Sequence, residues 1–349
     1  MTDTTFNLIP LLARVVAGED LTTADARAAF AHMVSGRASP IRTGALLAAL
    51  QTRGPAPAEV AGGVEALRAA MIPVRATDPA TLVDTCGTGG GRVSTFNIST
   101  AAAIVAAAGG VRVAKHGNRS FTSRCGSADV LEALGVAVEL SPEGMADVLA
   151  QAGIVFMFAP LLHPAMRHVG PVRQALGVTT IMNLLGPLAN PAGARRQVVG
   201  VADPAFLDLV VRGLAELGHE RALVVHGAPG MDEVSPCGPT SVAELGGGAV
   251  TRYEITPEEL GVEPVDPGAL AGGEPEENAA VVRAVVEGRE PGAARAAVLV
   301  NAAAAFYVAD RAETLREGVA AAERAIDSGA AAGVLEELVK GSQRAAATR

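Results

Sequence analysis

The chain has 349 residues, 49% of them apolar, so it can bury a substantial core and form one large domain or two unequal ones. A formal net charge of −9 and an aromatic content of 3% argue against a general nucleic-acid binder, which usually presents a basic surface and often stacking rings. Three widely spaced cysteines indicate neither a disulfide framework nor a zinc site, and neither a signal-peptide core nor a membrane helix is evident, so we expect a cytoplasmic protein.

Residues 1–72 predict a small domain of short amphipathic helices. Gly18, Gly36 and Gly54 each follow an apolar-periodic segment, where a helix C-terminus commonly places glycine. Ser39 followed by Pro40 is typical of an N-cap and a first helical position. We expect helices from about 165–190 to join this domain and residues 73–349 to form a larger α/β domain.

After Pro73, short β-rich runs alternate with longer alanine-rich runs, which is typical of βαβ units around a largely parallel sheet. The expected strands are 81–84, 111–114, 154–158, 197–201, 222–225 and 250–255. The expected helices are 99–108, 127–134, 205–217, 277–287, 293–308 and 312–328. The glycine- and proline-rich stretch 261–275 predicts a loop, and the polar run from Gly341 is expected to fray.

A glycine-rich loop at 87–91 follows the first expected strand, and residues 94–100 then lead into an alanine-rich helix. This arrangement allows backbone N–H groups and the positive end of a helix to face phosphate oxygens. The spacing matches neither the P-loop nor the dinucleotide fingerprint, so the loop alone could equally be a flexible turn.

A cationic, hydroxyl-rich segment at 115–127 follows the second expected strand. Because parallel strands place their C-terminal loops on one edge of the sheet, this segment should lie beside the glycine loop. Lys115 would supply positive charge, while Asn118, Ser123 and Ser127 would supply orienting hydrogen bonds. Two such loops predict a polyphosphate substrate.

A third loop carries adjacent carboxylates. His226 and Gly227, followed by residues 230–233, come after the expected strand 222–225 and should lie on the same edge. An acidic pair is usually only solvated, but Asp232 and Glu233 beside two phosphate-binding loops suit Mg²⁺, which prefers a few hard oxygens with substrate phosphate and water.

Several motifs in order resemble the anthranilate phosphoribosyltransferase family, of the class related to pyrimidine nucleoside phosphorylases. They are GTGG at 87–90, TFNIST at 95–100, KHGNR at 115–119, GSADVLEALG at 126–135, HPAMRHVGPVRQALG at 163–177, NLLGPLANP at 183–191 and DE at 232–233. The resemblance implies an α/β fold: a small α-helical domain plus a larger phosphoribosyl-binding domain with a mainly parallel sheet flanked by helices. It also implies two Mg²⁺ ions per subunit, the substrates anthranilate and phosphoribosyl pyrophosphate, a homodimer, and neither nucleic acid nor membrane as a partner.

Site residues follow from the same resemblance. The donor would bind at Gly87, Gly90, Gly91, Thr95, Asn97, Ile98, Ser99, Thr100, Lys115, His116, Gly117, Asn118, Arg119, Ser123 and Ser127. One magnesium ion would use Ser99 with Glu233, and the other Asp232 with Glu233. Anthranilate would contact Gly87, Asn118, His163 and Arg173.

The candidate catalytic residues are Lys115, His116 and Arg173. Arg173 can hold a carboxylate in a fork, and Lys115 with magnesium would stabilise negative charge on departing pyrophosphate. His116 and His163 would line the route of anthranilate. An aromatic amine is already a nucleophile, so whether His116 also assists proton removal stays open.

Two positions depart from the family pattern. Gly91 stands where most members have Asp, and we expect an altered dependence on magnesium. Thr179 stands where Arg is common, and we expect a looser contact between the domains.

Two other functions stay open. A pyrimidine nucleoside phosphorylase would share the architecture, but KHGNR followed by Arg173 in VRQALG favours the anthranilate enzyme, and a phosphorolysis assay separates them. A catalytically silent, nucleic-acid-binding paralogue would need a basic groove and eroded metal residues. Asp232, Glu233 and the net charge argue against it, and a gel-shift experiment checks this.

Overall fold

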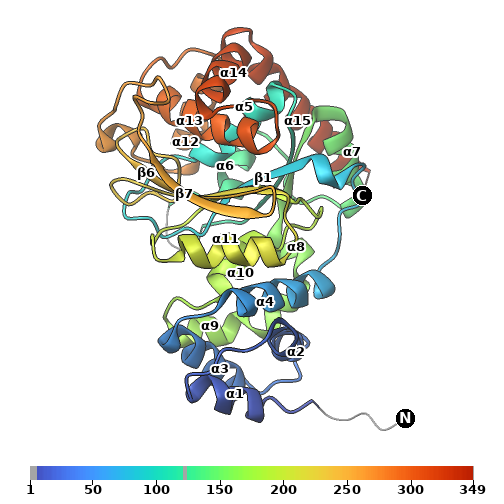
Figure 1. Cartoon of the computed structure of the whole chain (residues 1–349). Coiled ribbons are helices and arrows are strands. Elements are labelled where there is room, and N and C mark those ends of the chain that lie inside the picture. Colours follow the sequence, from blue (N-terminus) through green and yellow to red (C-terminus); the bar gives the residue numbers. More distant parts are fainter. Residues whose placement is uncertain (1–5, 121–123, 349) are drawn as a thin grey trace.

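Four helices form the N-terminal part of the chain in the computed structural model, which describes residues 6–120 and 124–348 (Figure 1). They are α1 (Ile9–Val16), α2 (Thr23–Val34), α3 (Pro40–Arg53) and α4 (Pro57–Ala70). The hydroxyl of Ser39 accepts a hydrogen bond from the Arg42 N–H, which confirms the predicted N-cap of α3. Gly18, Gly36 and Gly54 follow helices with φ values of 89°, 76° and 88°, as the predicted helix ends require.

Two later helices pack against these four. The helix α9 (Gly170–Leu176) contacts α3, and α10 (Met182–Leu188) contacts α4. A Cβ on Gly63 would lie 2.5 Å from the Leu185 side chain, so the close approach of α4 and α10 requires glycine. Val169, Ile181 and Leu185 belong to the same apolar core as the N-terminal helices. The expected boundary between residues 72 and 73 stays a prediction.

A seven-stranded sheet forms the centre of the larger part, with the order β3-β2-β1-β4-β5-β6-β7. Its strands are β1 (Leu82–Gly87), β2 (Arg112–Gly117), β3 (Ile154–Phe158), β4 (Arg196–Gly200), β5 (Arg221–Gly227), β6 (Thr240–Gly246) and β7 (Ala249–Ile255). The first five strands are parallel, while β6 and β7 pair antiparallel at one edge. The mainly parallel sheet is confirmed, although β6 was not predicted. The strand order reverses direction between β1 and β4, where ligands bind in open α/β sheets.

Helices cover both faces of this sheet (Figure 1). One face packs against α5 (Ile98–Ala108), α6 (Ser127–Ala133), α7 (Pro142–Ala152), α12 (Pro275–Val286), α13 (Ala293–Val308), α14 (Leu315–Asp327) and α15 (Ala330–Ala347). The other face packs against α11 (Phe206–Glu216) and the helical part that contains α10. The remaining short segments are α8 (Ala159–Leu162), η1 (Pro79–Thr81), η2 (Pro164–His168) and η3 (Pro267–Leu270).

The C-terminal segment corrects one expectation. The run from Gly341 does not fray but completes α15 through Ala347, and both Gly341 and Ser342 are buried. The Ser342 hydroxyl accepts a hydrogen bond from the Ala137 N–H at 3.0 Å. The sequence did not predict the buried face of this last turn, because alanine gives little hydrophobic contrast between the two sides of a helix.

None of the helices within the described ranges combines the length and the apolar character needed to cross a bilayer.

Candidate active site

Three loops meet at the carboxyl edge of the parallel strands, after β1, β2 and β5. The Asp232 carboxylate accepts a hydrogen bond from the Gly89 N–H at 2.9 Å, which joins the third loop to the first. A Cβ on Gly87 would lie 2.5 Å from that carboxylate, and one on Gly200 would collide with the Asp232 backbone. Glycine is therefore required sterically at 200, and a side chain at 87 would displace the Asp232 carboxylate. The first and third loops meet as expected.

Lys115 is buried at the centre of this edge, with a fractional exposure of 3%. Its ammonium donates to the backbone oxygen of Thr85 and, at 3.2 Å, to the hydroxyl of Ser99. Burial lowers the pKa of Lys115, while the nearby carboxylates of Asp84 and Glu233 favour its charged form. The positive charge is thus held between β1 and the start of α5.

Asp232 and Glu233 form a mutually repelling carboxylate pair. Burial and the charge of Asp232 raise the pKa of Glu233 to about 8, although Lys115 and the Ser99 backbone N–H act in the opposite direction. Across 6–120 and 124–348, no three His, Cys, Asp or Glu side chains gather closely enough to hold a metal ion alone. A partly buried pair of adjacent carboxylates, with few other protein ligands, fits Mg²⁺ completed by substrate oxygens and water.

The segment before α5 places other expected donor residues beside Lys115. The Asn97 amide donates to the Cys125 backbone oxygen at 3.3 Å and accepts from the Asn278 amide at 3.0 Å. Thr100 is buried, and its hydroxyl has no hydrogen-bond partner among the described residues. Thr95 pairs through its backbone with Ala271, and the Ile98 side chain belongs to the core, so Ile98 can offer only its backbone.

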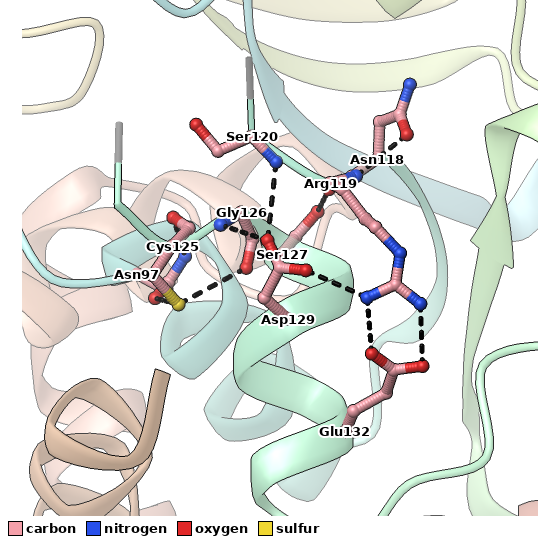
Figure 2. A network of polar contacts seen from close by, with 9 residues as sticks. All are labelled: Asn97, Asn118, Arg119, Ser120, Cys125, Gly126, Ser127, Asp129 and Glu132. Carbon is pink, nitrogen blue, oxygen red and sulfur yellow. Dashed lines mark hydrogen bonds and ion pairs between the residues drawn. The ribbon is translucent and has the colours of Figure 1, made fainter. Parts of the chain in front are cut away.

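In the loop after β2, the expected residues adopt different roles (Figure 2). The Ser127 hydroxyl donates to the Asn118 backbone oxygen at 3.2 Å. A Cβ on Gly117 would collide with the same hydroxyl. The guanidinium of Arg119 already pairs with Asp129 and Glu132 on α6, so its charge is partnered within the protein. Ser123 lies outside the described residues.

His116 and His163 form a buried pair whose ring centroids lie 4.9 Å apart. Burial lowers the pKa of His116 to about 3 and that of His163 to about 4, so both rings are neutral near pH 7. The Nε2 atom of each ring has no hydrogen-bond partner within the described part of the chain. Neutral rings of this kind suit the lining of a route for an aromatic substrate.

Arg173 comes from the helical part of the molecule, on α9 (Figure 1). It is half-buried, its guanidinium donates to the Asn183 side chain at 3.3 Å, and burial lowers its pKa. No carboxylate of the described ranges pairs with Arg173. Its charge is therefore available to an acidic ligand. Thr179 is exposed just beyond this helix.

Sequence reasoning missed a buried polar cluster beneath the site. The Asp84 carboxylate accepts from the His116 backbone N–H at 3.1 Å and from the Asn190 amide at 2.8 Å. It thereby links β1, β2 and the segment after α10. The sequence did contain an indication of this cluster, since Asp84 is a single acidic residue within an otherwise apolar strand. A buried carboxylate needs polar partners, so such partners could have been expected.

A glycine loop, a buried lysine and a carboxylate pair at one edge of an α/β sheet suit an enzyme that handles phosphates, and both parts of the chain match the glycosyl transferase class. Residues 79–332 match the description "Glycosyl transferase family, a/b domain", and residues 9–71 match "Glycosyl transferase family, helical bundle domain".

Within that class the chain belongs to the anthranilate phosphoribosyltransferase family. An anthranilate phosphoribosyltransferase of Rubrobacter xylanophilus is 52% identical over 335 residues, which cover 96% of this chain and 97% of the relative. The crystal structure of the enzyme from Thermus thermophilus superposes with a TM-score of 0.90 at 46% identity, over 95% of this chain and 99% of that one. The enzyme from Saccharomyces cerevisiae in complex with PRPP and Mg gives a TM-score of 0.87 at 25% identity, over 98% and 99% of the two chains.

Proposed function

We propose that this chain transfers the 5-phosphoribosyl group of phosphoribosyl pyrophosphate to the amine of anthranilate, giving N-(5-phosphoribosyl)anthranilate and pyrophosphate. This is the second step of tryptophan synthesis from chorismate. The observation that carries the proposal is the meeting of three loops at one sheet edge, where Asp232 binds the Gly89 N–H and Glu233 lies close enough to Lys115 for their charges to interact.

The donor binds across this edge. Backbone N–H groups of the glycine loop face the pyrophosphate oxygens, and the start of α5 adds the positive end of a helix. The Lys115 ammonium and the buried hydroxyl of Thr100, which lacks a partner within the described residues, contact the donor, and Asn118 and Ser127 orient the sugar phosphate. The guanidinium of Arg119 pairs with Asp129 and Glu132, and its contact with the donor stays a prediction.

Two magnesium ions fit the carboxylate pair, one with Ser99 and Glu233 and the other with Asp232 and Glu233. The support is the raised pKa of Glu233, which reflects first its burial and then the charge of Asp232; a cation bound there would favour the ionised pair. Magnesium would supply charge neutralisation of the pyrophosphate as it leaves.

The reaction requires the bond between ribose C1 and the pyrophosphate oxygen to break, with its electron pair leaving on pyrophosphate. A bond forms between C1 and the anthranilate nitrogen, which then loses one proton. Lys115 stabilises the charge that develops on the leaving group. Arg173 pairs with the carboxylate of anthranilate, and the neutral rings of His116 and His163 line its route with Gly87 and Asn118. With a pKa near 3, His116 is a weak base, which favours lining over proton removal.

Loss of anthranilate fluorescence in the presence of phosphoribosyl pyrophosphate and Mg²⁺ tests this function. We expect consumption that requires all three components and that falls by about 10²-fold or more in Asp232→Asn. Phosphorolysis of a pyrimidine nucleoside without anthranilate turnover would instead favour the phosphorylase alternative.

We also propose that α1 to α4 form one domain with the helices of 165–190, and that two copies of the chain associate through it. Ile9 and Val16 on α1 and Ile41 on α3 are 49%, 71% and 84% exposed, and these two helices contact each other. Such apolar groups at one end of a molecule are typical of a subunit interface. The free thiols of all three cysteines agree with the cytoplasm as the proposed compartment.

Light scattering after size exclusion checks the dimer. The wild-type chain should elute as a dimer, and Ile41→Glu should shift it toward the monomer because a charge would be buried at the interface. Ile72→Glu provides a matched control, since Ile72 is also exposed but lies outside α1 and α3. A monomeric wild type would contradict the proposal.

A further inference from the structure

One carboxylate contacts both ends of the loop that follows β2 (Figure 2). Asp129 lies in the first turn of α6. One of its oxygens accepts from the backbone N–H of Gly126 at 2.8 Å and from that of Ser120 at 3.3 Å. Its other oxygen accepts from the Arg119 guanidinium at 2.9 Å. A single side chain therefore connects the segment that leaves β2 with the segment that enters α6.

The base of this loop is closed tightly by backbone contacts. A Cβ on Gly126 would collide with the Ser120 nitrogen and would lie 2.6 Å from the Arg119 carbonyl carbon. The Asn118 backbone oxygen accepts from the Ser127 hydroxyl and the Ala128 N–H, each at 3.2 Å. Because the two segments of the loop lie in direct contact here, we expect a change at Asp129 to move Asn118 and Ser127 together.

The same loop reaches the start of α5. The Asn97 amide donates to the Cys125 backbone oxygen, and the Cys125 thiol donates to the Asn97 side-chain oxygen at 3.3 Å. Asn97 precedes the helix whose first residues face Lys115. The geometry at Asp129 is thus connected to both loops that hold the donor.

Asp129 is ionised near pH 7. Partial burial raises its pKa, but the Gly126 N–H and the Arg119 guanidinium outweigh this effect and hold the pKa below its usual value. A charged acceptor binds backbone N–H groups more strongly than a neutral one does.

We propose that Asp129 is a positioning residue for donor binding: by holding the N–H groups of Ser120 and Gly126, it sets the loop that carries Asn118 and Ser127 against phosphoribosyl pyrophosphate. This inference rests on the proposed function. Asp129 itself touches no substrate. Its effect falls mainly on the donor, because the carboxylate of anthranilate is held by Arg173 from another part of the chain, although Asn118 also lines the route of anthranilate.

Glu132 provides a matched control. It is one turn further along α6 and pairs with the same Arg119 guanidinium, but it accepts no hydrogen bond from the loop backbone among the described residues. Glu132→Gln therefore weakens the hold on Arg119 while leaving the loop base closed.

The test compares steady-state kinetics of the wild-type chain, Asp129→Ala, Asp129→Asn, Asp129→Glu and Glu132→Gln, each with its Tm. We expect Asp129→Ala and Asp129→Asn to raise KM for phosphoribosyl pyrophosphate about ten-fold, while KM for anthranilate rises by a clearly smaller factor. Asp129→Glu should restore part of the loss, and Glu132→Gln should leave both KM values within about two-fold of the wild type.

Three outcomes would overturn the inference: a lower Tm with unchanged KM for the donor, an equal rise in both KM values, or the same rise in Glu132→Gln. If Asp129→Ala does not fold, Asp129→Asn, which keeps the size of the side chain, decides. A wild-type chain that does not consume anthranilate rejects the proposed function itself, and is thereby distinguished from failure of the positioning role.

Discussion

At the scale of single residues, small side chains and unpaired polar groups define the site. A side chain at Gly200 on β4 would collide with the Asp232 backbone, and one at Gly87 would displace the Asp232 carboxylate. The buried hydroxyl of Thr100 and the Nε2 atoms of His116 and His163 have no partner in the described ranges. Because buried polar groups left alone cost free energy, these groups are expected to find partners in bound substrate.

The variant Gly91→Asp tests how the protein is affected by having glycine where most of the family has Asp. A Cβ at this position would lie 3.1 Å from the Asp232 carboxylate, so Gly91→Asp would add a negative charge beside the metal-binding pair. We expect the variant to need a lower Mg²⁺ concentration for half-maximal activity, since added negative charge attracts cations. A magnesium titration measures this, and identical profiles for the two proteins would reject the hypothesis.

Arg173 is expected to set the affinity for the acceptor. Arg173→Ala should lower kcat/KM for anthranilate by about 10-fold to 100-fold, because a charge-assisted pair is lost, and KM for the donor should change little. Arg173→Lys should recover only part of the activity, since an ammonium cannot form the two-pronged contact. Initial rates at varied anthranilate measure both effects. Arg167→Ala is a suitable control, because Arg167 is a neighbouring cation on η2; an equal loss there would contradict the role of Arg173.

At the scale of elements, chain ends and short helices carry more of the structure than their composition suggests. The helix α15 packs against α7 and α5, and its last turns extend beyond the expected fraying point. Gln343 donates to the Gly135 backbone oxygen at 3.0 Å, next to the bond between Ser342 and Ala137. The C-terminal turns therefore hold the segment that connects α6 to α7.

Ser342→Ala measures this hold. The Ala137 N–H would lose its partner at a partly buried position, so we expect the free energy of unfolding to fall by about 1–3 kcal/mol with unchanged KM values. Urea denaturation gives the free energy. Ser328→Ala, at the end of α14, is the comparison, and a loss of the same size there would show that the bond to Ala137 is not special.

At the scale of the whole molecule, buried histidines make stability depend on pH. Burial lowers the pKa of His219 to about 3, of His116 to about 3 and of His163 to about 4, all below the ordinary value of 6.5. The folded state therefore binds fewer protons than the unfolded chain between about pH 3 and 6.5, and stability is lost as the pH falls through that window. Glu233 and Asp84, whose pKa values are raised by burial to about 8 and about 6, act in the opposite direction.

His219 isolates this effect, because it lies at the end of α11 rather than among the three loops of the site. His219→Asn can keep the hydrogen bond to the Leu214 backbone oxygen but does not titrate. Between pH 7.5 and pH 5 the variant should lose about 2 kcal/mol less stability than the wild type. Denaturation at the two pH values measures the difference, and an equal loss in both proteins would show that His219 titrates normally in the folded state.

The sequence by itself was enough to predict the class of fold and a phosphate-binding site at the carboxyl edge of the parallel strands. Hydrophobic periodicity predicted six of the strands. The helix ends at the N-terminus could be predicted because glycine and the Ser39 cap act through local backbone geometry, which needs no tertiary partner. The order of loops after parallel strands was enough to expect Lys115 near Asp232 and Glu233.

Only the tertiary structure showed which side chains already have partners within the protein. The sequence did not indicate that Arg119 pairs with Asp129 and Glu132, and it suggested a fraying C-terminal run where Ser342 bonds to Ala137. The sequence also did not predict the strand β6 or the hydrogen bond between Asp84 and Asn190. Each depends on side-chain or strand contacts in the folded chain, and such contacts leave no periodic signal in the sequence.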